Sequence, residues 1–225
     1  MNTIKACIFD LDGVIVDTAK YHYQAWNTIA QKLGFEFTWE ENEQLKGVSR
    51  VDSLDIILQI GNITISQEEK QKYLVEKNEI YLDLIKDMNP SEILPGVQDF
   101  LTELKEREIK IALGSASKNA RPILKRVGLI DHFEAIVDGN EVVNGKPDPE
   151  VFVKGATALG VDCEEAVVFE DSRSGITAAN HGGFRSVGVG LPNVLDEAEY
   201  VIPGFADVNL NQIVEALGQS KLTEN

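Results

Sequence analysis

The order of the predicted elements constrains the fold more than any other feature of this sequence, because one short strand stands apart from all the others. Residues 4–9 form a mostly apolar run closed by Asp-Leu-Asp-Gly, a pattern typical of a short buried strand. From residue 18 to residue 90 the apolar spacing is helical instead. Two capping boxes predict helix starts within this stretch: Thr38 with Glu41, and Ser66 with Glu69. The first strand therefore has no partner until the chain leaves the helical stretch.

After residue 96 the pattern changes to an alternation of strands and helices. The predicted strands span residues 109–113, 135–137, 166–169 and 186–189, and the predicted helices span residues 97–108, 118–127, 149–159, 174–181 and 208–217. Such an alternation predicts a parallel sheet with helices on both faces. We therefore expect an α/β fold in which residues 1–16 and 92–225 form a Rossmann-like parallel-sheet core. Residues 17–91 are expected to form an all-helical cap domain inserted after the first strand.

The charge of the chain excludes several classes of partner. Its 225 residues carry 21 Lys and Arg against 37 Asp and Glu, a formal charge of −16. A field of this sign repels nucleic acid and acidic membrane surfaces, so we expect neither as a partner. Asp10 and Asp12 interrupt the early apolar stretch, which argues against a secretion signal, and no run approaches the roughly 20 apolar residues of a membrane helix. We expect a cytoplasmic monomer that binds an anionic ligand only through local positive groups.

Polar residues follow several of the predicted strands. Asp10 and Asp12 come after the first strand, and Glu170 and Asp171 come after the strand at 166–169. The carboxyl ends of parallel strands share one edge of a sheet, so these four carboxylates should converge there. Taken alone, the first pair is equally well explained as a polar turn that ends a strand. Four converging carboxylates would repel one another, and a hard divalent cation such as Mg²⁺ resolves that repulsion.

Ser115 and Lys146 supply the positive complement at the same edge. Ser115 lies in Gly-Ser-Ala-Ser before a predicted helix, whose free N–H groups favour an anion. Lys146 lies between turn-forming residues in Gly-Lys-Pro-Asp-Pro, although an exposed loop lysine is the commoner outcome. Carboxylates, a divalent cation, a hydroxyl and a lysine together indicate a phosphoryl-transfer site.

These motifs, in this order, resemble the four motifs of the haloacid dehalogenase superfamily. The resemblance covers the whole chain and implies that Asp10 attacks phosphorus to give an aspartyl-phosphate. It implies that Asp12 acts as general acid and base. It also implies that Mg²⁺ is held by Asp10, the backbone carbonyl of Asp12, Glu170 and Asp171.

A second set of residues narrows the resemblance to the β-phosphoglucomutase family. Lys-Gly-Val-Ser-Arg, ending at Arg50, and Ser-Ala-Ser-Lys-Asn, ending at Asn119, are similar to that family's segments. The resemblance implies interconversion of β-D-glucose 1-phosphate and D-glucose 6-phosphate through β-glucose 1,6-bisphosphate. Such chemistry needs a second site that holds the unreactive phosphate, which the resemblance assigns to Arg50, Ser117 and Asn119. Further substrate-binding residues implied are Gly47, Val48, Ser53, Trp26, Lys77, Ser115, Lys118 and Lys146.

Three residues of the helical stretch have competing interpretations. From the residues alone, Thr18 is an N-cap, His22 is structural, and Trp26 belongs to the core. The resemblance instead implies that Thr18 and His22 couple cap closure to Asp12, with His22 near Lys77, and that Trp26 lines the pocket.

Two alternative functions remain at this point. Gly-Lys-Pro-Asp-Pro is also common in phosphatases of the superfamily, so a Mg²⁺-dependent sugar-phosphate phosphatase with the same core and cap is the first. A catalytically silent sugar-phosphate-binding module is the second, and the intact pair Asp10 and Asp12 argues against it.

Overall fold

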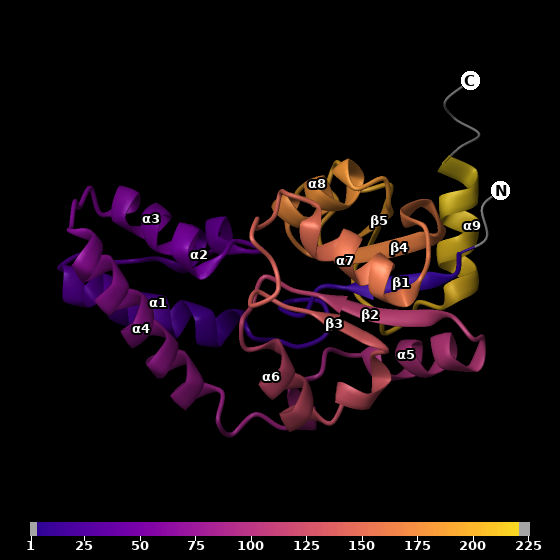
Figure 1. The fold of residues 1–225 in the computed structure, drawn as a ribbon, viewed down its shortest axis with the longest axis horizontal. Helices are drawn as coiled ribbons and strands as arrows, with labels where there is room; N and C mark the ends of the chain where they lie inside the picture. Colours follow the sequence, from indigo (N-terminus) through magenta and orange to yellow (C-terminus); the bar gives the residue numbers. More distant parts are fainter. Residues whose placement is uncertain (1–3, 221–225) are drawn as a thin grey trace.

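The fold is described from a computed structural model, which describes residues 4–220, and is centred on a six-stranded sheet (Figure 1). The strands are β1 Ala6–Phe9, β2 Lys110–Gly114, β3 Ala135–Val137, β4 Ala166–Glu170, β5 Arg185–Val189 and β6 Tyr200–Ile202. Their order is β3-β2-β1-β4-β5-β6, and every neighbouring pair is parallel. In β1, Phe9 lies opposite Leu113 of β2 and Phe169 of β4. The strand that stands alone in the sequence is therefore near the centre of the sheet, as the predicted α/β fold requires.

Helices cover both faces of the sheet. One face packs against α5 Val97–Glu106, α6 Ala120–Val127 and α9 Leu210–Ser220, and the other against α7 Glu150–Leu159 and α8 Arg173–His181. Because side chains alternate along a strand, β1 sends Cys7 and Phe9 to the first face and Ala6 and Ile8 to the second. All four side chains are buried, which explains why the strand is apolar throughout.

The remaining helices lie together beyond the carboxyl ends of the strands (Figure 1). We call α1 Ala19–Leu33, α2 Trp39–Asn42, α3 Arg50–Ile60 and α4 Gln67–Leu84 the cap helices. They have an apolar cluster of their own, which includes Trp26, Ile29 and Leu54. Both predicted capping boxes are confirmed, at the starts of α2 and α4.

The structure differs from the predicted elements mainly at their ends. The helix predicted over 118–127 begins only at Ala120, because the Ser117 hydroxyl accepts the Asn119 N–H and holds a turn there. Strand β6 has three residues at the sheet edge and was not predicted. Short 3₁₀ turns, also not predicted, occupy Glu43–Leu45, Pro90–Glu92, Ile130–His132 and Cys163–Glu165.

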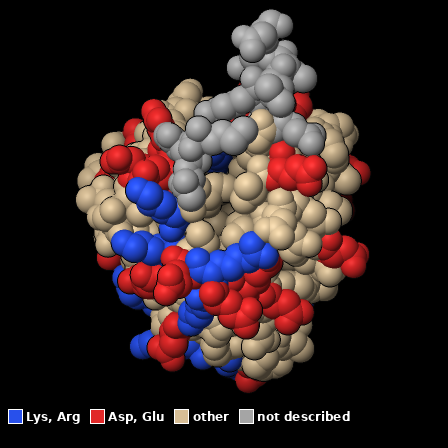
Figure 2. All heavy atoms as spheres, turned by 90° about the vertical axis from the view of Figure 1, so that its right-hand side faces the viewer, with Lys and Arg blue, Asp and Glu red and all other residues tan. Residues whose placement is uncertain are grey.

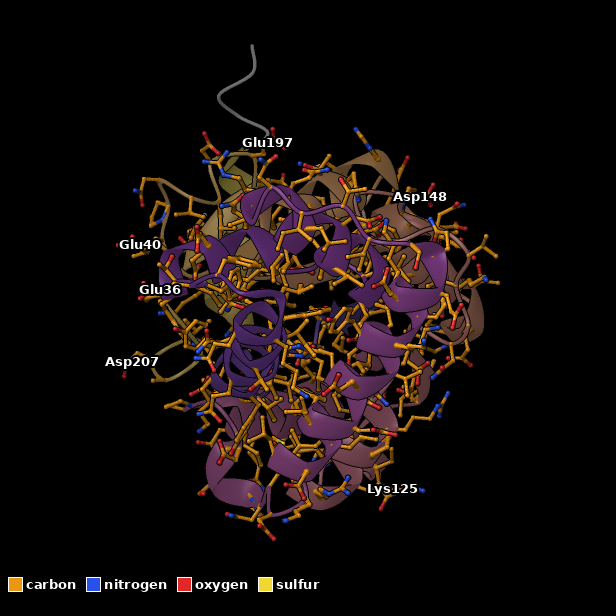
Figure 3. All side chains as sticks on the ribbon, turned by 90° about the vertical axis from the view of Figure 1, so that its left-hand side faces the viewer. Glu36, Glu40, Lys125, Asp148, Glu197 and Asp207 are labelled. Atoms are coloured by element: carbon orange, nitrogen blue, oxygen red, sulfur yellow. The ribbon has the colours of Figure 1, made fainter. Side chains whose placement is uncertain are left out.

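The negative charge is spread over the outside of the molecule. Glu36, Glu40, Asp148, Glu197 and Asp207 lie at the periphery of the view onto the cap helices (Figure 3). On the face opposite the cap helices, Lys and Arg lie among Asp and Glu (Figure 2). Among residues 4–220 no helix is both long and apolar enough to cross a bilayer.

Candidate active site

Three adjacent strands end at one place, and their carboxyl ends carry the predicted carboxylates. Asp10 follows β1, Ser115 follows β2, Glu170 is the last residue of β4, and Asp171 comes next. One oxygen from each of Asp10, Glu170 and Asp171 lies within 4.8 Å of the other two. The predicted convergence is confirmed for these three carboxylates, whereas the carboxylate of Asp12 lies beside Thr18 and His22.

The turn after β1 brings this loop against the end of β4. The backbone N–H of Asp12 donates to Asp10 Oδ2 at 2.9 Å, which orients the Asp10 carboxylate. Gly13 has a φ of +81°, and a Cβ at this position would lie 2.3 Å from Asp171 Oδ2. Glycine is therefore needed here both for the left-handed backbone and for the close approach to Asp171.

Lys146 is buried between two of the carboxylates and is not an exposed loop lysine. Its Nζ lies 2.5 Å from Asp10 Oδ1 and 2.7 Å from Glu170 Oε2. The ammonium also lies 4.8 Å from the ring centroid of Phe152. Burial alone would lower the pKa of Lys146, but the charges of Asp10 and Glu170 raise it above its usual value. The lysine is therefore protonated throughout the physiological range.

The carboxylates outnumber this one ammonium, and their protonation reflects the excess. Burial raises the pKa of Asp10 well above its ordinary value, although Lys146 opposes the shift. Burial and the charge of Glu170 raise the pKa of Asp171 to about 7. A buried, all-oxygen cluster with surplus negative charge has the donor chemistry that hard divalent cations prefer. Asp10, Glu170 and Asp171 therefore fit a divalent metal ion.

Asp12 has a different environment from Asp10. The Thr18 hydroxyl donates a hydrogen bond to Asp12 Oδ1, and His22 Nε2 lies 3.7 Å from the same oxygen. Burial would raise the pKa of Asp12, but His22, Thr18 and the charge of Lys77 together lower it below its usual value. Thr18 is the N-cap residue of α1, yet its side chain makes no capping hydrogen bond. The site therefore holds two carboxylates with oppositely shifted pKa values.

His22 and Lys77 form the outer part of the Asp12 environment. Lys77 Nζ lies 3.0 Å from His22 Nδ1, which confirms that the two residues are neighbours. Burial and then the charge of Lys77 lower the pKa of His22, while burial and then Arg50 lower the pKa of Lys77 to about 7. When Lys77 is an ammonium it can only donate to Nδ1, which would place the proton of neutral His22 on Nε2, facing Asp12.

A cavity of about 960 Å³ lies between the core and the cap helices, and most of the predicted site residues line it. Those that do are Asp10, Asp12, His22, Trp26, Gly47, Val48, Arg50, Ser53, Lys77, Ser117, Lys118, Asn119 and Asp171. Thr18, Ser115, Lys146 and Glu170 are buried and do not line it. Trp26 has both predicted roles, because it also belongs to the apolar cluster of the cap helices.

Arg50, the first residue of α3, is unusual among the charged residues of the cavity. Within the described residues its guanidinium has no ion pair and no hydrogen bond, in a chain with 37 Asp and Glu. Its partial burial lowers its pKa from the usual value. A half-buried guanidinium with no carboxylate partner is available for an anion.

Contacts around the site add residues that the sequence interpretation did not assign. Lys46 Nζ lies 3.6 Å from Asp171 Oδ2, and Asn119 Nδ2 donates to Asn78 Oδ1 at 3.0 Å. The Ser172 hydroxyl donates to Glu170 Oε1 at 2.7 Å. Lys46 and Asn78 are next to the predicted residues Gly47 and Lys77, and Ser172 directly follows the Glu-Asp pair. Sequence neighbours of motif residues were the only signal that could have found them.

Comparison with known proteins identifies the family. Residues 4–183 match the haloacid dehalogenase-like hydrolases. The chain belongs to this family. It is 41% identical over 224 residues to the β-phosphoglucomutase of Bacillus subtilis, with 99% of each chain covered. The haloacid dehalogenase resemblance seen in the motifs is thus confirmed.

Two further relatives extend the comparison within the haloacid dehalogenase-like hydrolases. The crystal structure of β-phosphoglucomutase from Clostridium difficile matches with a TM-score of 0.93 and 41% identity, covering 98% of this chain and 100% of that one. A phosphorylated-carbohydrates phosphatase from Thermotoga maritima is 34% identical over 206 residues, with 90% of this chain and 92% of the relative covered. Relatives named as mutases and a relative named as a phosphatase therefore each match at least 90% of this chain.

Proposed function

We propose that this chain is a Mg²⁺-dependent β-phosphoglucomutase, which interconverts β-D-glucose 1-phosphate and D-glucose 6-phosphate. Full-length similarity to two β-phosphoglucomutases supports the proposal. The geometric observation that carries it is the unpaired guanidinium of Arg50, which lines the same cavity as Asp10 and Asp12. A mutase that works through a bisphosphate must hold one phosphate while the other reacts, and Arg50 is a suitable clamp for the held one.

Asp10 is the proposed nucleophile. Its carboxylate is oriented by the Asp12 N–H and by Lys146, and it would attack the phosphorus to form an aspartyl-phosphate. Lys146 and Ser115 would contact the reactive phosphate. Arg50, Ser117 and Asn119 would hold the distal phosphate on the other side of the cavity.

Asp12 is the proposed general acid and base. Its low pKa, maintained by Thr18, His22 and Lys77, leaves it ionised and able to remove the proton from the attacking sugar hydroxyl. The same carboxyl, once protonated, returns the proton to the leaving sugar oxygen in the reverse step.

The metal site of the proposal is made by Asp10, Glu170 and Asp171, with the backbone carbonyl of Asp12 as a further ligand. When bound, Mg²⁺ would neutralise phosphate oxygens and the surplus of carboxylates. The ammonium of Lys146 contacts both Asp10 and Glu170.

The cap helices supply the remaining requirement, which is the exclusion of water. We propose that residues 17–91 act as a cap domain that closes over the sugar when Arg50 binds the distal phosphate. Gly47, Val48, Ser53, Trp26, Lys77 and Lys118 would surround the substrate. The monomeric state and the cytoplasmic location stay predictions.

A sugar-phosphate phosphatase is the second candidate, because the Thermotoga maritima relative is named as a phosphatase. ³¹P NMR of β-glucose 1-phosphate with enzyme, Mg²⁺ and a trace of the 1,6-bisphosphate separates the two candidates. The mutase predicts a growing glucose 6-phosphate signal with little inorganic phosphate. Stoichiometric inorganic phosphate without the isomer would identify a phosphatase, and no turnover would support the silent binding module.

A further inference from the structure

The side chain of Tyr81 has an unexplained polar atom. Tyr81 is on α4, one helical turn after Lys77, and is 1% exposed. Within residues 4–220 its hydroxyl makes no hydrogen bond of normal geometry, although the Thr18 hydroxyl lies close enough to lower its pKa. Buried hydroxyls are normally paired, because losing water without gaining a partner is unfavourable. Phenylalanine would fill the same space without this penalty, so the hydroxyl calls for a functional explanation.

Tyr81 contacts the side chains that surround Asp12. Its ring centroid lies 4.2 Å from that of His22, and Lys77 Nζ lies 4.6 Å from the Tyr81 centroid. Burial raises the pKa of Tyr81 well above its usual value, the charge of Asp12 raises it further, and the nearby Thr18 hydroxyl opposes the shift. Thr18 and His22 on one helix thus face Lys77 and Tyr81 on the other.

The hydroxyls of Thr18 and Tyr81 can pair as acceptor and donor. Thr18 uses its single proton to donate to Asp12, and its oxygen lone pairs remain able to accept. Tyr81 has a proton to donate, and Thr18 Oγ1 is a nearby acceptor. As the N-cap of α1, Thr18 could instead turn its hydroxyl toward the first N–H groups of that helix, a bond that it does not make here.

We propose that Tyr81 is a positioning residue for Asp12. During turnover its hydroxyl donates to Thr18 Oγ1, which keeps the Thr18 proton directed at Asp12 and away from the helix cap. Its ring packs against His22 and Lys77 and keeps both side chains close to the same carboxylate. This inference rests on the proposed role of Asp12 in the mutase reaction.

The test is Tyr81→Phe, which removes the hydroxyl and keeps the ring. Tyr81 does not line the cavity, so KM for β-glucose 1-phosphate should be unchanged. One neutral hydrogen bond predicts a kcat for isomerisation that is about threefold to tenfold lower. The melting temperature should stay equal or rise, because an unpaired buried hydroxyl is removed.

Tyr21→Phe is the matched control. The Tyr21 hydroxyl is paired, donating to Glu92 Oε1 at 2.7 Å, and does not line the cavity. This variant should keep its kcat and lose some thermal stability, which is the reverse of the pattern expected for Tyr81→Phe.

A third measurement separates positioning from general disorder. Phosphorylation of Asp10 by acetyl phosphate needs little help from Asp12, since acetate leaves without a proton, so Tyr81→Phe should be phosphorylated at the wild-type rate. Slower phosphorylation together with a lower melting temperature would assign Tyr81 a merely structural role. A kcat equal to that of wild type would also overturn the proposal.

The wild-type protein is assayed for isomer and for inorganic phosphate in the same experiment. If it only releases phosphate, the mutase proposal fails. The positioning role of Tyr81 is then still tested by comparing the rate of hydrolysis in Tyr81→Phe with that in the wild type.

Discussion

Lys146→Met should destabilise the metal-free protein severely. The substitution keeps the length of the side chain but removes the only ammonium among residues 4–220 that contacts both Asp10 and Glu170. Removing one partner of a buried ion pair costs about 3–5 kcal/mol, because the other partner stays buried and unpaired. The alternative for the protein is to protonate a carboxylate, which at pH 7.5 costs about 5 kcal/mol for an ordinary aspartate pKa of 3.8. The two figures agree on the scale of the loss.

The assay is thermal unfolding of wild type and variant in chelator, at pH 7.5 and at pH 5.5. At roughly 2–4 °C per kcal/mol for a chain of this size, the melting temperature should fall by about 6–20 °C at the higher pH. The deficit should shrink at pH 5.5, where protonating a carboxylate costs only about 2 kcal/mol. Mg²⁺ should stabilise the variant more than the wild type.

Lys154→Met is the matched control, because Lys154 pairs with Glu150 on the surface at 2.6 Å. Such pairs contribute about 0–1 kcal/mol, so this variant should unfold close to the wild type. The reasoning about the carboxylate cluster would be refuted if Lys146→Met were no less stable than Lys154→Met, or if its deficit grew on acidification.

Three further predictions follow from the same site. Asp12→Asn should slow isomerisation by about 10²–10⁴-fold while leaving Mg²⁺ binding largely intact by calorimetry, and complete loss of metal binding would contradict its proton-transfer role. Arg50→Lys should lower the kcat/KM of isomerisation by roughly tenfold or more, and Arg50→Ala should lower it further. The hydrolysis of acetyl phosphate should be nearly unchanged in both variants. Much slower hydrolysis with normal isomerisation would instead place Arg50 at the reactive phosphate. In chelator, lowering the pH from 8 to 6 should stabilise the wild type relative to Asp171→Asn by up to about 1.4 kcal/mol per pH unit. The reason is that folded Asp171, with a pKa of about 7, takes up a proton over this range, whereas the unfolded carboxyl does not. A difference in the free energy of unfolding that does not change with pH, measured by chemical denaturation, would refute this shift.

The sheet could be predicted because its signals are local. The apolar run of β1 reflects burial on both faces, and the capping boxes at Thr38 and Ser66 are formed by side chains three residues apart. Strand β6 escaped prediction, although β3, a strand of the same length at the other edge of the sheet, was predicted.

The site was predictable only in part, for a related reason. Asp10 and Glu170 are found from their places at strand ends, because a parallel sheet brings those ends together. The contact of Lys46 with Asp171 and the packing of Tyr81 beside Thr18 depend on how the cap helices lie against the core. No spacing in the sequence encodes that arrangement. Thr18 shows the limit most clearly, since its position predicts an N-cap but its hydroxyl is directed at Asp12 instead.

In the proposed mutase reaction, the phosphoryl group on Asp10 passes to a sugar and not to water. The direct measurement is to phosphorylate the enzyme with acetyl phosphate and Mg²⁺, remove the donor, add β-glucose 1-phosphate and follow the phosphoryl group by ³¹P NMR. With a mutase, the group should appear on β-glucose 1,6-bisphosphate faster than it is released without sugar, and Asp10→Asn should accept none. Release as inorganic phosphate at the same rate with and without the sugar would contradict it.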